Sequence, residues 1–248
     1  MSGNVWPYPR WVAHRGAGKL APENTLAAFR LGAQYGYRMF ECDVKLSRDG
    51  VPFLLHDTDL TRTTEATGNA GEREWSDLSR LDAGAWHSRA FAGEPLPTLE
   101  GISRFCRTNG LFLNIEIKPS PGLEAATGHA VATAAQDLWR GAPVPPLLTS
   151  FRPEALASAR EACPELPRGL LLDTLWPGWL EMARSLQCCA IVCNYSLWNT
   201  ETVAAVQGAG MRTASYTVND ESIARHLMAL GTDVIITDRV DLFAPADA

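Results

Sequence analysis

The chain has 248 residues, of which 46% are hydrophobic and 20% are charged. This composition is typical of a folded globular protein and excludes a disordered chain. With 22 basic and 28 acidic residues, the formal net charge is −6. An acidic balance argues against nucleic-acid binding and against binding to anionic membranes, because both usually need a basic surface. We therefore expect no nucleic-acid partner and no stable membrane association.

Two further features bear on the location of the protein. The chain has no run of about 18 apolar residues, and residues 1–10 lack the basic start and apolar stretch of a signal peptide. The six cysteines match no zinc-binding spacing, and Cys188, Cys189 and Cys193 lie in the apolar run CCAIVCNY. We interpret this trio as reduced thiols on a buried strand, which favours a cytoplasmic location.

Short apolar and β-branched runs alternate with amphipathic helical patterns along the chain. The candidate strands are residues 11–16, 39–45, 51–57, 111–118, 147–151, 168–173, 190–195, 212–218 and 233–237. Between them, helical spacing of apolar residues is clearest in residues 24–35, 153–162, 199–209 and 220–230. This alternation predicts an α/β fold with a parallel sheet and crossover helices.

The number of repeats favours a closed barrel. Eight or so βα units in about 250 residues fit a TIM-type (β/α)8 barrel better than an open doubly wound sheet. The second and third candidate strands are joined only by residues 46–50, a length that suits a hairpin and is too short for a parallel crossover. We therefore expect a distorted barrel in which one of the candidate strands lies outside.

From residue 58 to about residue 97 the alternation stops. This stretch contains several glycines and aromatic residues but no clear helix or strand pattern. Roughly forty residues of this kind inside a compact domain predict a functional insertion. We expect the whole chain, residues 1–248, to be one barrel domain with this small insertion after the third strand.

Charged side chains and histidines recur at the ends of the first four candidate strands. These residues are His14, Arg15, Glu41, Asp43, His56, Glu116 and Lys118. A lone carboxylate on a strand usually forms a rim salt bridge, and a lone histidine is usually structural. Four successive strands with the same pattern at one end instead predict a shared site, because active sites of barrels lie at the carboxyl ends of the strands.

The residue types indicate the chemistry of this site. Glu41, Asp43 and Glu116 would form a set of hard oxygen donors, which suits Mg²⁺ or Ca²⁺ better than zinc. Arg15 and Lys118 supply cationic donors, and an arginine fork matches phosphate oxygens.

Two histidines complete the predicted site. Unperturbed histidine has a pKa near 6.5, and this residue type suits alternate use as base and acid, which we expect of His14 and His56. Together with a metal and cationic donors, they predict phosphoryl transfer on an ester. The chain has no serine nucleophile elbow and no Walker phosphate loop.

Short motifs follow one another over nearly the whole chain. They are HRG at 14–16, PENT at 22–25, ECD at 41–43, DG at 49–50, HD at 56–57, LTRTT at 60–64, LPTLEG at 96–101, EIK at 116–118, SF at 150–151, YTVN at 216–219 and IITD at 235–238. In this order they resemble the signature of the glycerophosphodiester phosphodiesterase family. The resemblance implies a distorted TIM-type barrel of the phospholipase-C-like class, with residues 58–97 as the insertion of that family.

The resemblance also implies an activity and a set of roles. The activity is hydrolysis of small glycerophosphodiesters, such as glycerophosphocholine or glycerophosphoethanolamine, to an alcohol and sn-glycerol 3-phosphate. The roles are an acid–base pair, the ligands of one divalent cation (Mg²⁺ or Ca²⁺), and phosphate contacts. The resemblance implies that the acid–base pair is His14 and His56. It implies that the metal ligands are Glu41, Asp43 and Glu116, and that the phosphate contacts are Arg15 and Lys118. Within the acid–base pair, we expect His14 to be the base and His56 the acid.

Two alternatives remain open at this stage. A lipid-directed phospholipase of D or C type, acting for example on lysophospholipids, could use the same barrel and would need an apolar rim facing the membrane. A catalytically inactive binding module would be expected to have lost a metal ligand or a histidine, and all of these residues are present.

Several neighbouring residues have two possible interpretations. Lys45 shares a strand face with the acidic pair and either contacts substrate or projects beyond the barrel mouth. Phe151 either lines a head-group pocket or packs in the core, and Tyr216 could shape the same pocket. Asn219 and Asp220 are interpreted as a strand end followed by a helix N-cap.

Overall fold

Strands and helices alternate along the residues that the computed structural model describes, 6–243 and 245. The strands are β1 (Trp11–Ala13), β2 (Met39–Leu46), β3 (Pro52–Leu54), β4 (Phe112–Ile117), β5 (Leu147–Ser150), β6 (Arg168–Leu172), β7 (Ala190–Asn194), β8 (Arg212–Tyr216) and β9 (Val234–Thr237). The α-helices are α1 (Leu26–Gln34), α2 (Trp75–Leu78), α3 (Leu99–Thr108), α4 (Glu124–Leu138), α5 (Pro153–Ala162), α6 (Trp179–Ser185), α7 (Thr200–Gly208) and α8 (Glu221–Leu230). Each of these strands overlaps a strand expected from the sequence.

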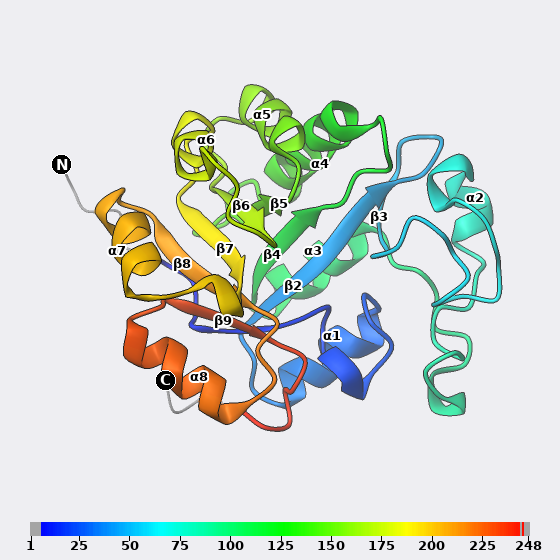
Figure 1. The fold of residues 1–248 in the computed structure, drawn as a ribbon. Helices are drawn as coiled ribbons and strands as arrows, with labels where there is room; N and C mark the ends of the chain where they lie inside the picture. Colours follow the sequence, from blue (N-terminus) through cyan, green and yellow to red (C-terminus); the bar gives the residue numbers. More distant parts are fainter. Residues whose placement is uncertain (1–5, 244, 246–248) are drawn as a thin grey trace.

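Eight of the strands close into a parallel barrel surrounded by helices (Figure 1). The sheet order is β1-β9-β8-β7-β6-β5-β4-β2-β3, and a further pairing of β1 with β2 completes the ring. β3 is the strand outside the ring, because it pairs antiparallel with β2 through the short hairpin that the sequence indicated. The expected TIM-type α/β barrel, distorted at this hairpin, is confirmed.

The two faces of β2 show how the barrel combines a core with a polar interior. Phe40, Cys42 and Val44 point outward and pack in the main hydrophobic core with the surrounding helices. Met39 points inward and joins an apolar cluster that fills the lower part of the barrel. Side chains alternate along a strand, so Glu41 and Asp43, the next inward positions after Met39, lie above this cluster toward the carboxyl end.

The segment 58–97 is more ordered than the sequence suggested. It contains the short helix α2 and two 3₁₀ turns, η2 (Ala70–Glu72) and η3 (Arg89–Phe91), and it extends from one side of the barrel next to β3 (Figure 1). Helices of three or four residues leave no detectable periodicity in a sequence. The segment shares a small hydrophobic cluster with β3 and the residue that follows this strand. The cluster consists of Phe53, Leu55, Leu60, Ala70, Leu78, Ala83 and Leu96.

Two further observations concern membrane spans and the C-terminus. No helix within the described residues is long and apolar enough to cross a membrane. Residues 244 and 246–248 lie outside the described residues.

The loop after β1 packs closely against α1, and this contact needs glycine on both sides. Gly16 has a φ of +103°, a conformation that side chains with a Cβ rarely adopt. Across the contact, a Cβ placed on Gly32 would lie 2.2 Å from the carbonyl oxygen of Gly16 and 2.7 Å from the ring of Phe40. The loop that carries His14 and Arg15 is therefore held against the first helix.

We expect Gly32→Ala to destabilise the protein by more than about 2 kcal/mol, because the added methyl group overpacks a closed contact. Alanine is a better helix former than glycine by about 1 kcal/mol, so helix propensity alone predicts that this substitution stabilises the protein. Gly208→Ala is the matched control, since Gly208 ends α7 and nothing lies within 4 Å of a Cβ built there. The free energy of unfolding, measured by urea denaturation, tests this. Equal effects of the two substitutions would contradict the packing argument.

Candidate active site

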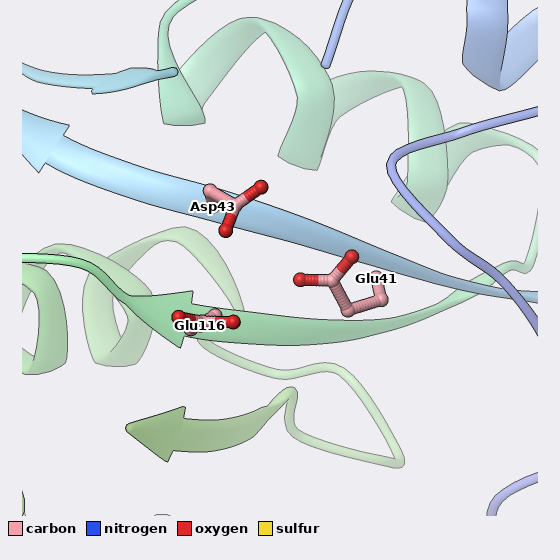
Figure 2. A group of neighbouring side chains, drawn as sticks. All are labelled: Glu41, Asp43 and Glu116. Atoms are coloured by element: carbon pink, nitrogen blue, oxygen red, sulfur yellow. The ribbon is translucent and has the colours of Figure 1, made fainter. Parts of the chain in front are cut away.

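Three buried carboxylates come together on two neighbouring barrel strands. Glu41 and Asp43 lie on β2, Glu116 lies on β4, and the strand register pairs Asp43 with Glu116. Their exposed fractions are 3%, 0% and 8%, and one carboxylate oxygen from each lies within 4.8 Å of the others. Figure 2 shows the three groups gathered on the same side of the two strands.

The carboxylates have the character of a metal site. Glu41 Oε1 and Asp43 Oδ1 are buried and have no hydrogen-bond partner in the described structure. An unsatisfied buried oxygen of a carboxylate is costly, and a divalent cation would satisfy both. Glu41, Asp43 and Glu116 therefore fit a metal ion and could hold one, as the sequence predicted.

Two cations flank this cluster. Arg15 Nε lies 3.2 Å from Asp43 Oδ2, and Lys118 Nζ lies 2.7 Å from Glu116 Oε1 and 3.4 Å from Asp43 Oδ1. Burial alone would raise the pKa of Asp43, but Arg15 and Lys118 outweigh it and hold that pKa below its usual range. Burial and the charge of Asp43 raise the pKa of Glu116 to about 7. The same causes raise the pKa of Glu41 well above its usual range.

Two non-glycine residues beside the cluster adopt left-handed backbone conformations. Arg15 has a φ of +52°, and its backbone N–H donates to Glu41 Oε2 at 3.1 Å. Asn24 has a φ of +59°; its Nδ2 donates to Asp43 Oδ2, and its Oδ1 accepts from the backbone N–H of Asp43. Such conformations concentrate at functional sites. The sequence indicated Asn24 only as a helix start, so this support for Asp43 was missed.

Each of the two histidines is oriented by a carboxylate. His14 Nδ1 lies 2.6 Å from Asp238 Oδ1, and His56 Nδ1 lies 2.6 Å from Asp57 Oδ1. The pKa of each aspartate is about 2, so both are ionised at neutral pH and can only accept hydrogen bonds. In each ring, Nδ1 therefore donates a hydrogen bond to the aspartate. Nε2 is the ring nitrogen that these aspartates do not contact, and Nε2 of His14 lies 3.7 Å from Glu41 Oε2.

Asp238 and Asn219 end two of the sequence motifs, IITD and YTVN, but the sequence analysis assigned no role in the site to either residue. Asn219 Nδ2 donates to Asp238 Oδ2 at 2.9 Å, and the backbone N–H of Asp238 donates to Asn219 Oδ1 at 2.9 Å. Asn219 is therefore more than the strand end that the sequence suggested. Asp220 does cap α8 as expected, since its side chain accepts from the backbone N–H groups of Ser222 and Ile223.

Two adjoining cavities lie at the carboxyl end of the barrel. The smaller, of about 170 Å³, is bordered by both histidines and by Arg15, Glu41, Glu116 and Lys118. The larger, of about 450 Å³, shares His56, Glu116 and Lys118 with it. The structure thus brings together all seven residues that the sequence singled out, with Asp43 beneath the smaller cavity beside its partners Arg15 and Lys118.

Three further residues border these cavities. Lys45 is 1% exposed, lines the larger cavity, and donates from Nζ to the carbonyl oxygen of Lys118 at 3.1 Å. The possibility that it projects beyond the mouth is therefore wrong, since the residue is almost completely buried. Phe151 lines both cavities and packs edge-to-face on Tyr216, which borders the smaller one.

A model of the glycerophosphoryl diester phosphodiesterase family matches residues 14–242. The chain belongs to this family. It is an enzyme, a phosphoric diester hydrolase, and both the barrel and the cluster of acids and histidines agree with this assignment.

Relatives of known structure or function resemble the chain over almost its full length. A phosphodiesterase from Oleispira antarctica, solved in complex with the product sn-glycerol-3-phosphate, is 34% identical, with a TM-score of 0.89 and coverage of 97% of each chain. A glycerophosphodiester phosphodiesterase from Agrobacterium tumefaciens is 30% identical, with a TM-score of 0.80 and coverage of 96% of this chain and 99% of that one. The glycerophosphodiester phosphodiesterase of Caldanaerobacter subterraneus is 30% identical over 92% of this chain and 93% of its own.

The pKa values of the cluster predict how metal binding depends on pH. Burial and the neighbouring carboxylates raise the pKa of Glu116 to about 7 and the pKa of Glu41 well above its usual range, whereas a metal needs both carboxylates deprotonated. We expect Mg²⁺ or Ca²⁺ to displace protons, so that affinity rises with pH and falls below about pH 7. Isothermal titration in buffers of different ionisation enthalpy measures this release. Glu116→Gln should release fewer protons, and a pH-independent affinity in the unsubstituted enzyme would contradict the prediction.

Proposed function

We propose that this enzyme hydrolyses small glycerophosphodiesters, such as glycerophosphocholine and glycerophosphoethanolamine, to an alcohol and sn-glycerol 3-phosphate. The observation that carries the proposal is the single cavity bordered by carboxylates, two cations and two histidines, each oriented by an aspartate at Nδ1. The product found in the Oleispira antarctica relative, which shares 34% of its sequence with this chain, supports the same chemistry.

In this proposal, Glu41, Asp43 and Glu116 hold one divalent cation. Their oxygen donors favour Mg²⁺ or Ca²⁺ over softer metals. When bound, such a cation offsets the negative charge that develops on the free oxygens of the phosphodiester.

Arg15 and Lys118 are the proposed phosphate contacts. Both border the smaller cavity, and both are fixed on the carboxylates of the cluster rather than free in solvent. A guanidinium and an ammonium held in place in this way present charge-assisted donors to an anionic substrate without a large cost of ordering. Their positions also explain how an acidic protein binds an anion.

The two histidines are the proposed acid and base. His14 Nε2 removes a proton from the glycerol hydroxyl next to the phosphoester, and that oxygen attacks phosphorus. His56 starts this step as the doubly protonated imidazolium. It gives the proton of Nε2 to the oxygen of the departing alcohol as the bond of that oxygen to phosphorus breaks, which leaves a cyclic phosphate. Water then opens the ring with the two histidine roles reversed, and sn-glycerol 3-phosphate is formed. Attack by a hydroxyl within the substrate gains a large effective concentration.

A lipid-directed phosphodiesterase is the second candidate, and one observation favours it. Leu123 and Leu175 are 42% and 36% exposed. They lie on loops whose neighbouring residues Glu124 and Trp176 line the larger cavity. Exposed leucines at the mouth of a site could contact the acyl chain of a lysophospholipid.

We also propose a cytoplasmic location. All six cysteines are free thiols, and burial raises the pKa of Cys106, Cys188 and Cys193 to about 12. Unpaired thiols in these numbers are typical of a reducing compartment.

The activity can be tested with the metal-stripped enzyme. We expect release of sn-glycerol 3-phosphate from glycerophosphocholine to be lost in EDTA and restored by Mg²⁺ or Ca²⁺, because Arg15 and Lys118 offset only part of the negative charge of the three carboxylates. The assay is repeated with micellar lysophosphatidylcholine. Faster turnover of the lipid would favour the second candidate, and absence of turnover on both substrates with either metal would rule out the proposed function.

Replacing either histidine should abolish most of the turnover. We expect His14→Ala and His56→Ala each to lower kcat by about 10²-fold or more, because each loses a proton-transfer group. His226→Ala is the control, since His226 is exposed on α8 and should leave kcat unchanged. Steady-state kinetics with glycerophosphocholine measures both, and near-normal turnover in a site variant would remove that histidine from the mechanism.

A further inference from the structure

Arg62, in the segment 58–97, joins two parts of the site that are otherwise separate. Its Nε donates to Asp57 Oδ2 at 2.5 Å. Its two terminal nitrogens donate to the two carboxylate oxygens of Glu23, at 2.8 Å and 2.7 Å. One guanidinium thus binds the carboxylate that follows β3 and the carboxylate that precedes α1.

Each of these carboxylates also holds a residue of the site. Asp57 Oδ1 contacts His56 Nδ1 at 2.6 Å, and Glu23 Oε1 accepts from the guanidinium of Arg15 at 2.9 Å. A continuous chain of contacts therefore runs from His56 through Asp57, Arg62 and Glu23 to Arg15. It links the proposed proton donor to the proposed phosphate contact.

The ionisation of Asp57 and Glu23, the two carboxylates in this series of contacts, depends on Arg62. The hydrogen bond from Arg62 is the largest cause that lowers the pKa of Asp57 to about 2. Burial would raise the pKa of Glu23, but the contacts with Arg62 and Arg15 outweigh it and lower that pKa. Both carboxylates are therefore ionised, and the two-nitrogen contact with Glu23 adds directional specificity to the attraction.

The rest of the segment 58–97 is fixed against the same loop. His87 Nε2 lies 3.0 Å from the carbonyl oxygen of Lys19, and the backbone N–H of Ala27 donates to Glu94 at 2.9 Å. These contacts hold the segment on the loop that follows β1 and on the first turn of α1. Among these contacts with the β1 loop, that of Arg62 leads directly to residues of the site.

We propose that Arg62 is a positioning residue for the reaction. Through its contacts with Asp57 and Glu23, it fixes the positions of the His56 and Arg15 side chains relative to each other. This inference rests on the proposed function. Arg62 makes no proposed contact with substrate, and it is 42% exposed at its side chain. A displacement of about 1 Å at a reacting group can cost about 10²-fold in rate, so such a link can matter without contributing much stability.

The test compares substitutions at two arginines. We expect Arg62→Gln to lower kcat by about 10- to 100-fold and to raise KM for glycerophosphocholine. Arg62→Lys should recover part of the loss, because an ammonium keeps the charge but cannot form the two-nitrogen contact. Arg48→Gln is the matched control: Arg48 is exposed and pairs with Glu74 at 2.6 Å, away from the site. It should change kcat and KM by less than about twofold.

Isosteric substitutions can separate the effect of Arg62 on His56, through Asp57, from its effect on Arg15, through Glu23. Asp57→Asn should mainly lower kcat through His56, and Glu23→Gln should mainly raise KM through Arg15. Arg62→Gln added to the Asp57→Asn/Glu23→Gln background should have little further effect, because both groups that Arg62 holds are already neutral. A structural role for Arg62 would instead give an additional, independent loss.

Three outcomes decide the matter. Unchanged kcat and KM in a folded Arg62→Gln variant overturn the inference. Loss of activity in proportion to the fraction of unfolded protein, measured by thermal denaturation, also overturns it, because the loss is then one of folding. The unsubstituted enzyme is assayed in parallel, and if it does not hydrolyse glycerophosphodiesters, the proposed function itself fails and the inference fails with it.

Discussion

The site depends on placing three carboxylates side by side inside a protein barrel. Glu41, Asp43 and Glu116 lose nearly all contact with water, and their charges repel one another at the distances seen here. Two cations offset part of this cost, and they act mainly on Asp43, which stays ionised. The negative charge of Glu41 and Glu116 is less completely offset by neighbouring cations. This remaining negative charge makes the cluster suitable for a divalent cation.

The barrel tolerates such a cluster because each strand has two different faces. On β2, outward residues such as Phe40 and Val44 pack in the core beneath the helices. Inward residues change from apolar Met39 to acidic Glu41 and Asp43 toward the carboxyl end. Closure of the ring supplies hydrogen bonds for the backbone on both sides of β2, so the strand stays in place despite its buried charges.

Much of this arrangement could be predicted from the sequence. Charged residues inside short apolar strands identified the cluster, and the five-residue loop before β3 predicted the hairpin. What could not be predicted were the partners of the histidines and of Arg15. His14 and Asp238 are 224 positions apart and meet only because β1 and β9 are neighbours in the barrel. Asn24, Glu23 and Arg62 lie in loops, where polar residues are common and carry no periodic signal.

The two histidines are supported in different ways, and this follows from the fold. His14 follows a barrel strand, and its partner Asp238 follows the adjacent strand β9, so the ring itself fixes their separation. His56 follows β3, which lies outside the ring, and its partner Asp57 is its neighbour in sequence and more exposed than Asp238. Among the barrel strands, only β2 pairs with β3, so the sheet holds this second pair from one side. An arginine supplied by the segment beside β3 and anchored on Glu23 gives the pair a second attachment to the barrel.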